Sequence, residues 1–512
     1  MSKLLKDTFV GLGKVGAYLA KGYMLKKEDG ARFATSSEEG DLFHPRNRGL
    51  IVDGVKKRLS EKDSFEHIAI IAPPGKGKST GYIRPNIFDK ASQHCSMVIT
   101  DPSGELYDDT SQHLNDKGFE VLTLRPDNLT VSSKFNPFHG LDARDVIKIE
   151  QVCASIVLSK YGGDKEGVWN DGAISLLEVF AKCLAYTMPK YLNLPNLNYL
   201  CQMFGADGAD LDDWVTEHSI NPYDASDNSI VDSWTGIVTS NERMLSSYAT
   251  IARTALKQLN NRQVQQLLSV DDIDLANFRK KKTAIYLIIP ENERKYYQFL
   301  VDIFYSRFFS IMMDHELLPN ELDVYCFLDE FGNSYIDDFQ TIVNNIRKYR
   351  VSLSMVFQGV SQISEKYGDI AGQSIKSGIG TFMLYAGADY QTASEQSNIL
   401  GKRRIIHRDN LIGGEEKYTE VDLLPPDKIR TLENNQVLFV SSNRHPVIFE
   451  FTPFYQNGKY KSMARKGAYQ QPPNRHHNTF HQLRLWEHGD ARKQKLMKAM
   501  THKKNNYEYD HE

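Results

Sequence analysis

The sequence predicts an α/β protein in which a mostly parallel β-sheet carries helices and a separate all-α domain is inserted into the chain. Three observations support this prediction. Short apolar runs rich in β-branched residues recur along the chain, with helical patterns between several of them. A glycine-rich loop follows the first of these runs, and two adjacent acidic residues end another. The 250 or so residues between these two features exceed what a compact sheet domain needs, and much of this stretch is helical in pattern.

The composition is that of a large globular protein. The chain has 512 residues, of which 41% are hydrophobic, enough for about two to four domains. A formal net charge of −3 gives no overall field that would attract nucleic acid or a membrane. The five cysteines are widely spaced and form no CxxC pair. This usage indicates reduced thiols in a cytosol rather than a disulfide framework or a zinc site.

The first apolar run, residues 67–71 (HIAII), suits a buried parallel strand. It leads into APPGKGKST, residues 72–80, which fits the pattern GxxxxGK[ST] except that Ala72 replaces the first glycine. In this pattern, backbone N–H groups and a helix N-terminus bind phosphate, a lysine reaches the β- and γ-phosphates, and a hydroxyl binds Mg²⁺. We therefore predict an ATP site with Mg²⁺ at Pro74, Gly75, Lys76, Gly77, Lys78, Ser79 and Thr80.

The acidic pair lies in VYCFLDEFG, residues 324–332. Asp329, at the C-terminal end of a buried strand, is placed to hold Mg²⁺ together with Ser79. Glu330 directly follows and can polarise a water molecule for attack on the γ-phosphate. This layout is typical of ATP-hydrolysing motors and is seldom found in small-molecule kinases. The structural alternative is two acids that open a helix, where the helix dipole favours them.

Six further apolar runs fit strands of the same sheet, namely 96–100, 120–124, 283–290, 352–358, 381–386 and 437–442. The stretch 456–512 has twelve Lys and Arg against five Asp and Glu, and few apolar residues, which favours a flexible tail. We divide the chain into an N-terminal segment (1–61), a first nucleotide-binding part (62–141), an all-α inserted domain (142–275), a second nucleotide-binding part (276–455) and a basic tail (456–512). The basic N-terminal segment either docks on a membrane or partner or begins with an ordinary surface helix, which its sequence favours.

A series of short motifs runs in order from about residue 30 to residue 455. Besides the glycine-rich loop, these are GARFATSSE (30–38), VITDPSGELYDDT (98–110), FNPF (135–138), VWNDGA (168–173), KKTAIYLIIP (281–290), FLDEFGN (327–333), the stretch 346–368, NILGK (398–402) and LLPPDKIRTL (423–432). Together they resemble the type IV secretion coupling proteins of the TraG/TraD type. These are RecA-like ATPases that deliver DNA and an attached relaxase to a conjugative secretion channel.

The resemblance implies the same roles for Lys78, Ser79 and the acidic pair, and it adds two residues. Arg347, in IRKYR, matches the arginine that family members contribute to the nucleotide of a neighbouring subunit. Gln358 ends the following strand, where a motor places a γ-phosphate sensor. The resemblance also implies a ring hexamer around a DNA channel. Its partners would be single-stranded DNA bound without sequence preference, a relaxase received by the inserted domain, and the channel ATPases.

One departure from the family is large. Most members begin with two transmembrane helices, whereas no stretch here reaches the roughly 18 uncharged apolar residues that span a bilayer. We therefore expect a soluble variant in the bacterial cytoplasm, peripheral at the inner face of the cell membrane. A small membrane adaptor or the basic N-terminus would recruit it. Two alternatives remain: a related hexameric motor for DNA packaging or segregation, and a nucleotide-dependent docking platform without significant hydrolysis.

Overall fold

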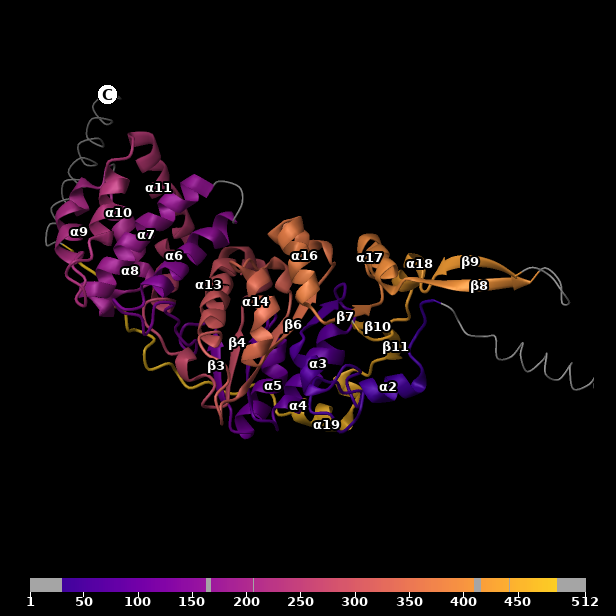
Figure 1. Cartoon of the computed structure of the whole chain (residues 1–512). Coiled ribbons are helices and arrows are strands. Elements are labelled where there is room, and N and C mark those ends of the chain that lie inside the picture. The colour runs from indigo at the N-terminus through magenta and orange to yellow at the C-terminus, as the bar shows by residue number, and fades with distance from the viewer. Residues whose placement is uncertain (1–29, 163–166, 206, 409–415, 442, 486–512) are drawn as a thin grey trace, which may run out of the picture. The chain divides into compact units, whose positions relative to one another are not determined.

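The computed structural model describes residues 30–162, 167–205, 207–408, 416–441 and 443–485. The chain divides into two compact units, and Figure 1 labels their elements. The first unit comprises Met1–Gln93, Tyr325–Gly332 and Val351–Lys466, and the second comprises His94–Val324, Asn333–Arg350 and Gly467–Glu512. These units do not follow the five segments expected from the sequence, because the helical residues pack in one unit with the strands that precede and follow them.

Among the described residues, the main sheet has nine strands in the order β11-β10-β7-β1-β6-β5-β2-β4-β3. Strand β1 pairs in parallel with β6 and β7, and β4 pairs in parallel with β2 and β3. Strand β10 is antiparallel to both of its neighbours. The strands are β1 (Ile68–Ile71), β2 (Cys95–Thr100), β3 (Glu120–Leu124), β4 (Thr283–Leu287), β5 (Asp323–Leu328), β6 (Val351–Phe357), β7 (Thr381–Tyr385), β10 (Gln436–Ser441) and β11 (Val447–Glu450).

The mostly parallel α/β fold predicted from the sequence is confirmed. Every apolar run assigned to the sheet forms a strand, and all residues of β1, β4 and β6 are buried. Continuous burial is expected of parallel strands, since helices cover both faces of the sheet. Strand β11 was missed, as was a separate antiparallel ribbon of β8 (Lys402–Arg408) and β9 (Glu416–Asp422). Both strands of the ribbon are rich in charged residues and show no continuous apolar run.

The first unit surrounds its strands with short helices. These are α2 (Ser36–Leu42), α3 (Glu61–Phe65), η1 (Ser79–Ile83), α4 (Arg84–Lys90), η7 (Phe331–Asn333), α15 (Ser361–Tyr367), α16 (Asp369–Gly378), α17 (Tyr390–Leu400), α18 (Pro426–Arg430), η9 (Phe454–Gln456) and α19 (Gly458–Ala464).

The second unit is mostly helical. Its helices are α5 (Glu105–Asp116), α6 (Val146–Tyr161), α7 (Gly167–Thr187), η2 (Pro189–Tyr191), α8 (Leu194–Met203), η3 (Ala209–Leu211), α9 (Asp212–His218), α10 (Ser229–Val238), α11 (Glu242–Ala255), η4 (Lys257–Asn260), α12 (Arg262–Leu267), η5 (Leu275–Asn277), η6 (Glu291–Glu293), α13 (Arg294–Met312), α14 (Phe339–Asn345) and η8 (Ile346–Tyr349). Helices α7 and α11 pack closely, since a Cβ atom on Gly172 would lie 2.1 Å from the Tyr248 ring. None of the described helices is both long and apolar enough to cross a bilayer.

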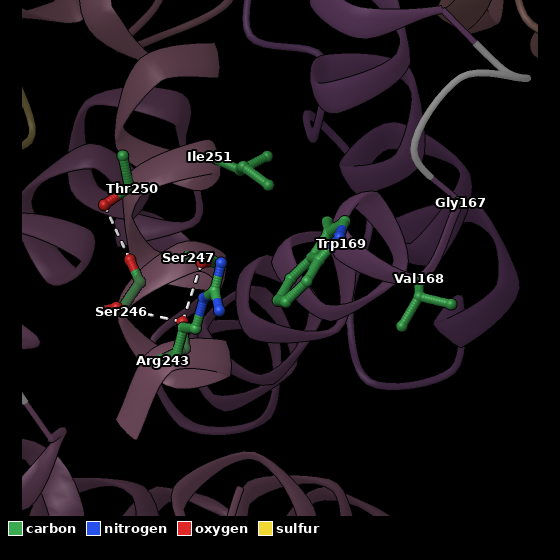
Figure 2. A pocket seen from close by; sticks show the side chains of 8 residues that line it. All are labelled: Gly167, Val168, Trp169, Arg243, Ser246, Ser247, Thr250 and Ile251. Carbon is green, nitrogen blue, oxygen red and sulfur yellow. Dashed lines mark hydrogen bonds between the residues drawn. The ribbon is translucent and has the colours of Figure 1, made fainter. Parts of the chain in front are cut away.

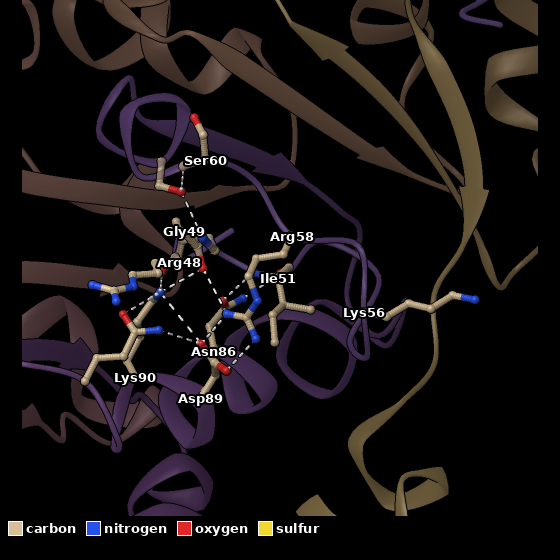
Figure 3. A network of polar contacts seen from close by, with 12 residues as sticks. Arg48, Gly49, Ile51, Lys56, Arg58, Ser60, Asn86, Asp89 and Lys90 are labelled. Carbon is tan, nitrogen blue, oxygen red and sulfur yellow. Dashed lines mark hydrogen bonds and ion pairs between the residues drawn. The ribbon is translucent and has the colours of Figure 1, made fainter. Parts of the chain in front are cut away.

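Part of the expected N-terminal docking segment is built into the first unit (Figure 3). The fully buried Lys90 on α4 donates from Nζ to the carbonyl oxygens of Arg48 (2.7 Å) and Gly49 (2.8 Å). Arg58 forms an ion pair with Asp89 on the same helix at 2.6 Å. These contacts hold the chain around residues 48–58 against the helix that follows the glycine-rich loop. Residues 1–29 lie outside the described part of the chain.

The expected flexible tail also differs from the structure over its first thirty residues. In the first unit, Tyr460 of α19 stacks on Phe88 with ring centroids 5.7 Å apart. In the second unit, Lys134 is 2% exposed and donates to the carbonyl oxygen of Thr479 at 2.7 Å, and Asn196 donates to that of His481 at 3.0 Å. Buried polar side chains thus bind the backbone of this segment, which has few apolar residues of its own. Residues 486–512 lie outside the described part.

Candidate nucleotide-binding site

The glycine-rich loop begins where β1 ends, at the carboxyl edge of the sheet. The parallel register pairs Ile71 with Phe357 of β6 and with Leu384 of β7, and the N–H of Ala72 then donates to the Phe357 carbonyl at 3.0 Å. Strands on both sides therefore hold the start of the loop. A crevice at the carboxyl ends of parallel strands is the usual ligand site in open α/β sheets.

Two glycines give the loop its shape. Gly75 and Gly77 have φ angles of +75° and +92°, a region that side chains other than glycine rarely adopt. Gly77 is also constrained by packing, because a Cβ atom there would lie 2.6 Å from Cζ of Phe451. The same ring would lie 2.3 Å from a Cβ atom on Gly81, one turn into the following helix. The Phe451 ring thus packs against the loop and the helical turn after it, a role that no motif in the sequence indicates.

A helix N-terminus follows the loop at once. Residues Ser79–Ile83 form a π-helical turn, η1, which continues directly into α4. No side chain caps this start. Its first N–H groups and the positive end of the helix dipole are therefore available to an anion. Thr80 is engaged locally, since its hydroxyl donates to the Gly77 carbonyl at 3.2 Å.

The structure brings three of the predicted site residues together. Lys78 Nζ lies 2.8 Å from Oδ1 of Asp329, and the Ser79 hydroxyl donates to Oδ2 of the same carboxylate at 3.3 Å. The side chains of Lys78 and Asp329 are only 13% and 10% exposed. A cation, a hydroxyl and an acid from positions 250 residues apart thus share one small, largely desolvated space. In such surroundings charge-assisted contacts are stronger than in water.

Glu330 and Gln358 lie at the same edge of the sheet. Glu330 follows Asp329 with a φ of +59°, which is costly for a residue with a side chain and is often kept at functional sites. Gln358 directly follows β6, the strand between β1 and β5, and its side chain is exposed. Its N–H donates to Oε1 of Gln362 at 2.8 Å, and a Cβ atom on Gly332 would lie 2.5 Å from that same Oε1. The Gln362 side chain therefore links the end of β6 to the turn after the acidic pair.

Three predicted positions remain, and of these Pro74 is exposed on the loop. Lys76 Nζ donates to Oδ1 of Asn434 at 2.9 Å, at the turn before β10. Arg347 belongs to the second unit, where it is exposed on η8. Nearby, Arg350 is held by Asp323 at 2.7 Å.

The helical part of the second unit has a concave surface of its own (Figure 2). A pocket of about 660 Å³ lies between the start of α7 and one face of α11. Trp169 is on one wall, and Arg243 with Ser246, Ser247 and Thr250 is on the other. The hydroxyls of Ser246 and Ser247 donate to the Arg243 carbonyl within α11. An aromatic ring opposite a guanidinium is a composition typical of recognition surfaces.

The fold and the loop together define the class of protein: a RecA-like P-loop nucleotide-binding ATPase fold. The family model described as "Type IV secretory system Conjugative DNA transfer" matches residues 38–478. The chain therefore belongs to this family of conjugative coupling proteins.

Individual relatives are distant. The chain is 22% identical over 420 residues to the protein VirD4 of Rhizobium radiobacter, in an alignment that covers 78% of this chain and 58% of that protein. The chain thus spans a little over half the length of this curated relative. Among solved structures, the plasmid coupling protein TrwB with the ATP analogue ADPNP has a TM-score of 0.64 and 16% identity over 83% of this chain and 94% of that chain. TrwB with the GTP analogue GDPNP has a TM-score of 0.65, and TrwB with ADP and Mg²⁺ one of 0.64. Both are 15% identical over the same shares of the chains.

Proposed function

We propose that the chain is an ATP-hydrolysing coupling protein of a conjugative type IV secretion system. It recruits relaxase-bound DNA to the transfer channel and helps to pump that DNA. The observation that carries the proposal is the meeting of Lys78, Ser79 and Asp329 at the end of a P-loop strand, in a chain that belongs to the coupling-protein family.

The residues at the loop fit Mg²⁺ and ATP. Two oxygen ligands of six-coordinate Mg²⁺ lie about 2.9 Å apart when each is about 2.0–2.1 Å from the ion. The Ser79 and Asp329 oxygens are 3.3 Å apart, which is close to that spacing. When bound, Mg²⁺ neutralises charge on the phosphate oxygens. Lys78 would exchange its contact with Asp329 for the β- and γ-phosphates.

The hydrolytic step is assigned to side chains around this centre. Glu330 polarises the attacking water molecule, and its fixed backbone conformation holds the carboxylate at the carboxyl edge of the sheet. Gln358 senses the γ-phosphate from the end of the neighbouring strand. Arg347 is contributed to the nucleotide of an adjacent subunit in a hexamer. Its exposure leaves the planar donors of the guanidinium available to charge that develops on the transferring phosphoryl group.

The other partners are assigned to other parts of the chain. Single-stranded DNA is bound through its phosphates without base readout, as a motor that tracks any sequence requires. The helices of residues 142–275 receive the relaxase, and the pocket between α7 and α11 offers a surface for it. The protein works on the cytoplasmic side of the cell membrane beside the channel ATPases. A small membrane adaptor or the basic N-terminal segment places it there.

Plasmid transfer tests this function. The parent gene should restore conjugation to a strain that lacks it, and Lys78→Ala should not. The purified parent should hydrolyse ATP faster when single-stranded DNA is added. ATP hydrolysis without rescue of transfer would indicate a related packaging or segregation motor. Rescue by a protein without measurable hydrolysis would indicate a docking platform.

A further inference from the structure

The position of Lys78 sets the direction of a bound nucleotide along the edge of the sheet. Its Nζ atom points to Asp329, which follows β5, on the side of β1 where β6 and β5 lie. The P-loop lysine contacts the β- and γ-phosphates, while the backbone of the loop holds the α- and β-phosphates. The terminal phosphate therefore lies toward β5. The nucleoside must then leave the loop on the other side, toward β7, β10 and β11.

The chain segment that follows β11 lies on this side of the loop. Strand β10 is antiparallel to both β7 and β11, so β11 runs in the same direction as β1 and ends at the same carboxyl edge. Its continuation returns to the loop: Phe451 lies under Gly77 and Gly81, and η9 (Phe454–Gln456) packs against η1. The chain around Gly54 also lies close to this helical turn, because a Cβ atom on Gly54 would lie 2.9 Å from the Gly81 carbonyl oxygen.

Three aromatic side chains in this segment have different surroundings. Phe451 is 7% exposed and packs on Tyr385 with ring centroids 5.1 Å apart. Phe454 faces the Arg84 guanidinium at 5.2 Å. Tyr455 is 50% exposed and meets Phe454 only edge-on, at 5.7 Å between centroids. Its ring is thus the most exposed of the three, and it belongs to η9, which contacts the first helical turn after the loop.

We propose that Tyr455 is the surface on which the nucleobase of the bound nucleotide stacks. This inference rests on the proposed ATP function and assigns the part of the site that holds the base. An aromatic ring stacks on the face of a base and does not contact the polar groups at its edge. Since every base has a π-face, such stacking does not distinguish one base from another. The nearby Asn434 has its amide oxygen engaged by Lys76 at 2.9 Å. The site therefore accepts a purine nucleoside triphosphate with little discrimination between adenine and guanine.

The test compares ligands with and without a base on the full-length protein. Affinities of Mg-ATP, Mg-GTP and Mg-tripolyphosphate are measured by calorimetry for the parent, Tyr455→Ala and Tyr455→Phe. We expect Tyr455→Ala to weaken both nucleotides about tenfold and to leave tripolyphosphate within about twofold of the parent. Tyr455→Phe should keep parental affinities, because it keeps the ring. Tyr390→Ala removes a tyrosine of comparable exposure (68%) from the same unit and should change none of the three.

Each other result overturns the proposal in a recognisable way. Unchanged nucleotide affinity in Tyr455→Ala means that the base lies elsewhere. An equal loss for tripolyphosphate and nucleotides means that Tyr455 supports the shape of the loop and not the base. A loss for one purine alone means that its edge is read. If Lys78→Ala leaves all three affinities at parental values, or if the parent binds none of the ligands, the nucleotide site itself is misplaced and the proposed function fails with it.

Discussion

Replacing Asp329 with asparagine should have opposite effects on ATP binding with and without Mg²⁺. In the structure the Asp329 carboxylate pairs with Lys78 at 2.8 Å. Free ATP must break this pair to reach the lysine, and it then places its terminal phosphate beside a carboxylate of like charge. Bound Mg²⁺ would remove this repulsion, because its charge would offset the charges of the carboxylate and the phosphate. Asp329→Asn removes both the competing partner of Lys78 and the strongest protein ligand for the ion.

The size of the effect follows from the burial of the pair. Both side chains are nearly enclosed, at 13% and 10% exposure, so solvent screens their interaction little. A hydrogen bond to a charged group contributes about 1.5–3 kcal/mol under such conditions. Without the carboxylate that competes with phosphate for Lys78, the variant should bind ATP about tenfold to a hundredfold more tightly when Mg²⁺ is absent. Binding of Mg-ATP should weaken by a similar factor.

Equilibrium binding of a fluorescent ATP analogue, once in EDTA and once in excess Mg²⁺, measures both affinities. Glu395→Gln is a matched control, because it removes the carboxylate of another lysine pair in the same unit (Lys376, 2.9 Å). This control should leave both affinities unchanged. If Asp329→Asn binds ATP more weakly than the parent in EDTA, the carboxylate does not compete with phosphate for Lys78 and the reasoning is refuted.

Three further predictions concern turnover, assembly and the shape of the loop. Glu330→Gln should bind Mg-ATP as the parent does but hydrolyse it about a hundredfold to ten thousandfold more slowly, because an amide cannot act as a base; phosphate-release rates measure this, and parental turnover would contradict the assignment. Arg347→Ala should bind ATP nearly normally and lose about a thousandfold in turnover. Mixing it with Glu330→Gln over a range of ratios should restore part of the activity if the arginine acts on a neighbour, and parental turnover of Arg347→Ala alone under assembling conditions would rule the role out. Gly77→Ala should lower the free energy of unfolding by about 1–3 kcal/mol more than Gly75→Ala does, because a Cβ atom at Gly77 would clash with Phe451 at 2.6 Å whereas nothing lies within 4 Å of one at Gly75. Denaturant unfolding compares the two variants, and equal losses would show that the clash does not matter.

The strands of the sheet could be located from sequence where their burial is continuous. Runs such as residues 283–287 and 352–357 are apolar almost throughout, and the structure forms β4 and β6 there. The ribbon of β8 and β9 gave no such signal, because it is antiparallel and rich in charged residues. The contacts of residues 467–485 could not be predicted for a related reason. They are anchored by buried polar side chains such as Lys134 and Asn196, which lie far away in the sequence.

The sequence by itself was enough to recognise the family of the protein and to predict the chemistry of the loop. Lys78 and Ser79 are adjacent in a local pattern, and Asp329 with Glu330 ends an apolar run, so both halves of the site could be recognised without any distance between them. Only the tertiary structure decided how they meet. Strand order places β6 and β5 on one side of β1 and β7, β10 and β11 on the other. That order brings Asp329 to Lys78 and puts Phe451 against Gly77 of the loop. Such contacts depend on which strands pair. Strand pairing is set by the burial of the whole sheet, so it cannot be predicted from any short stretch of sequence.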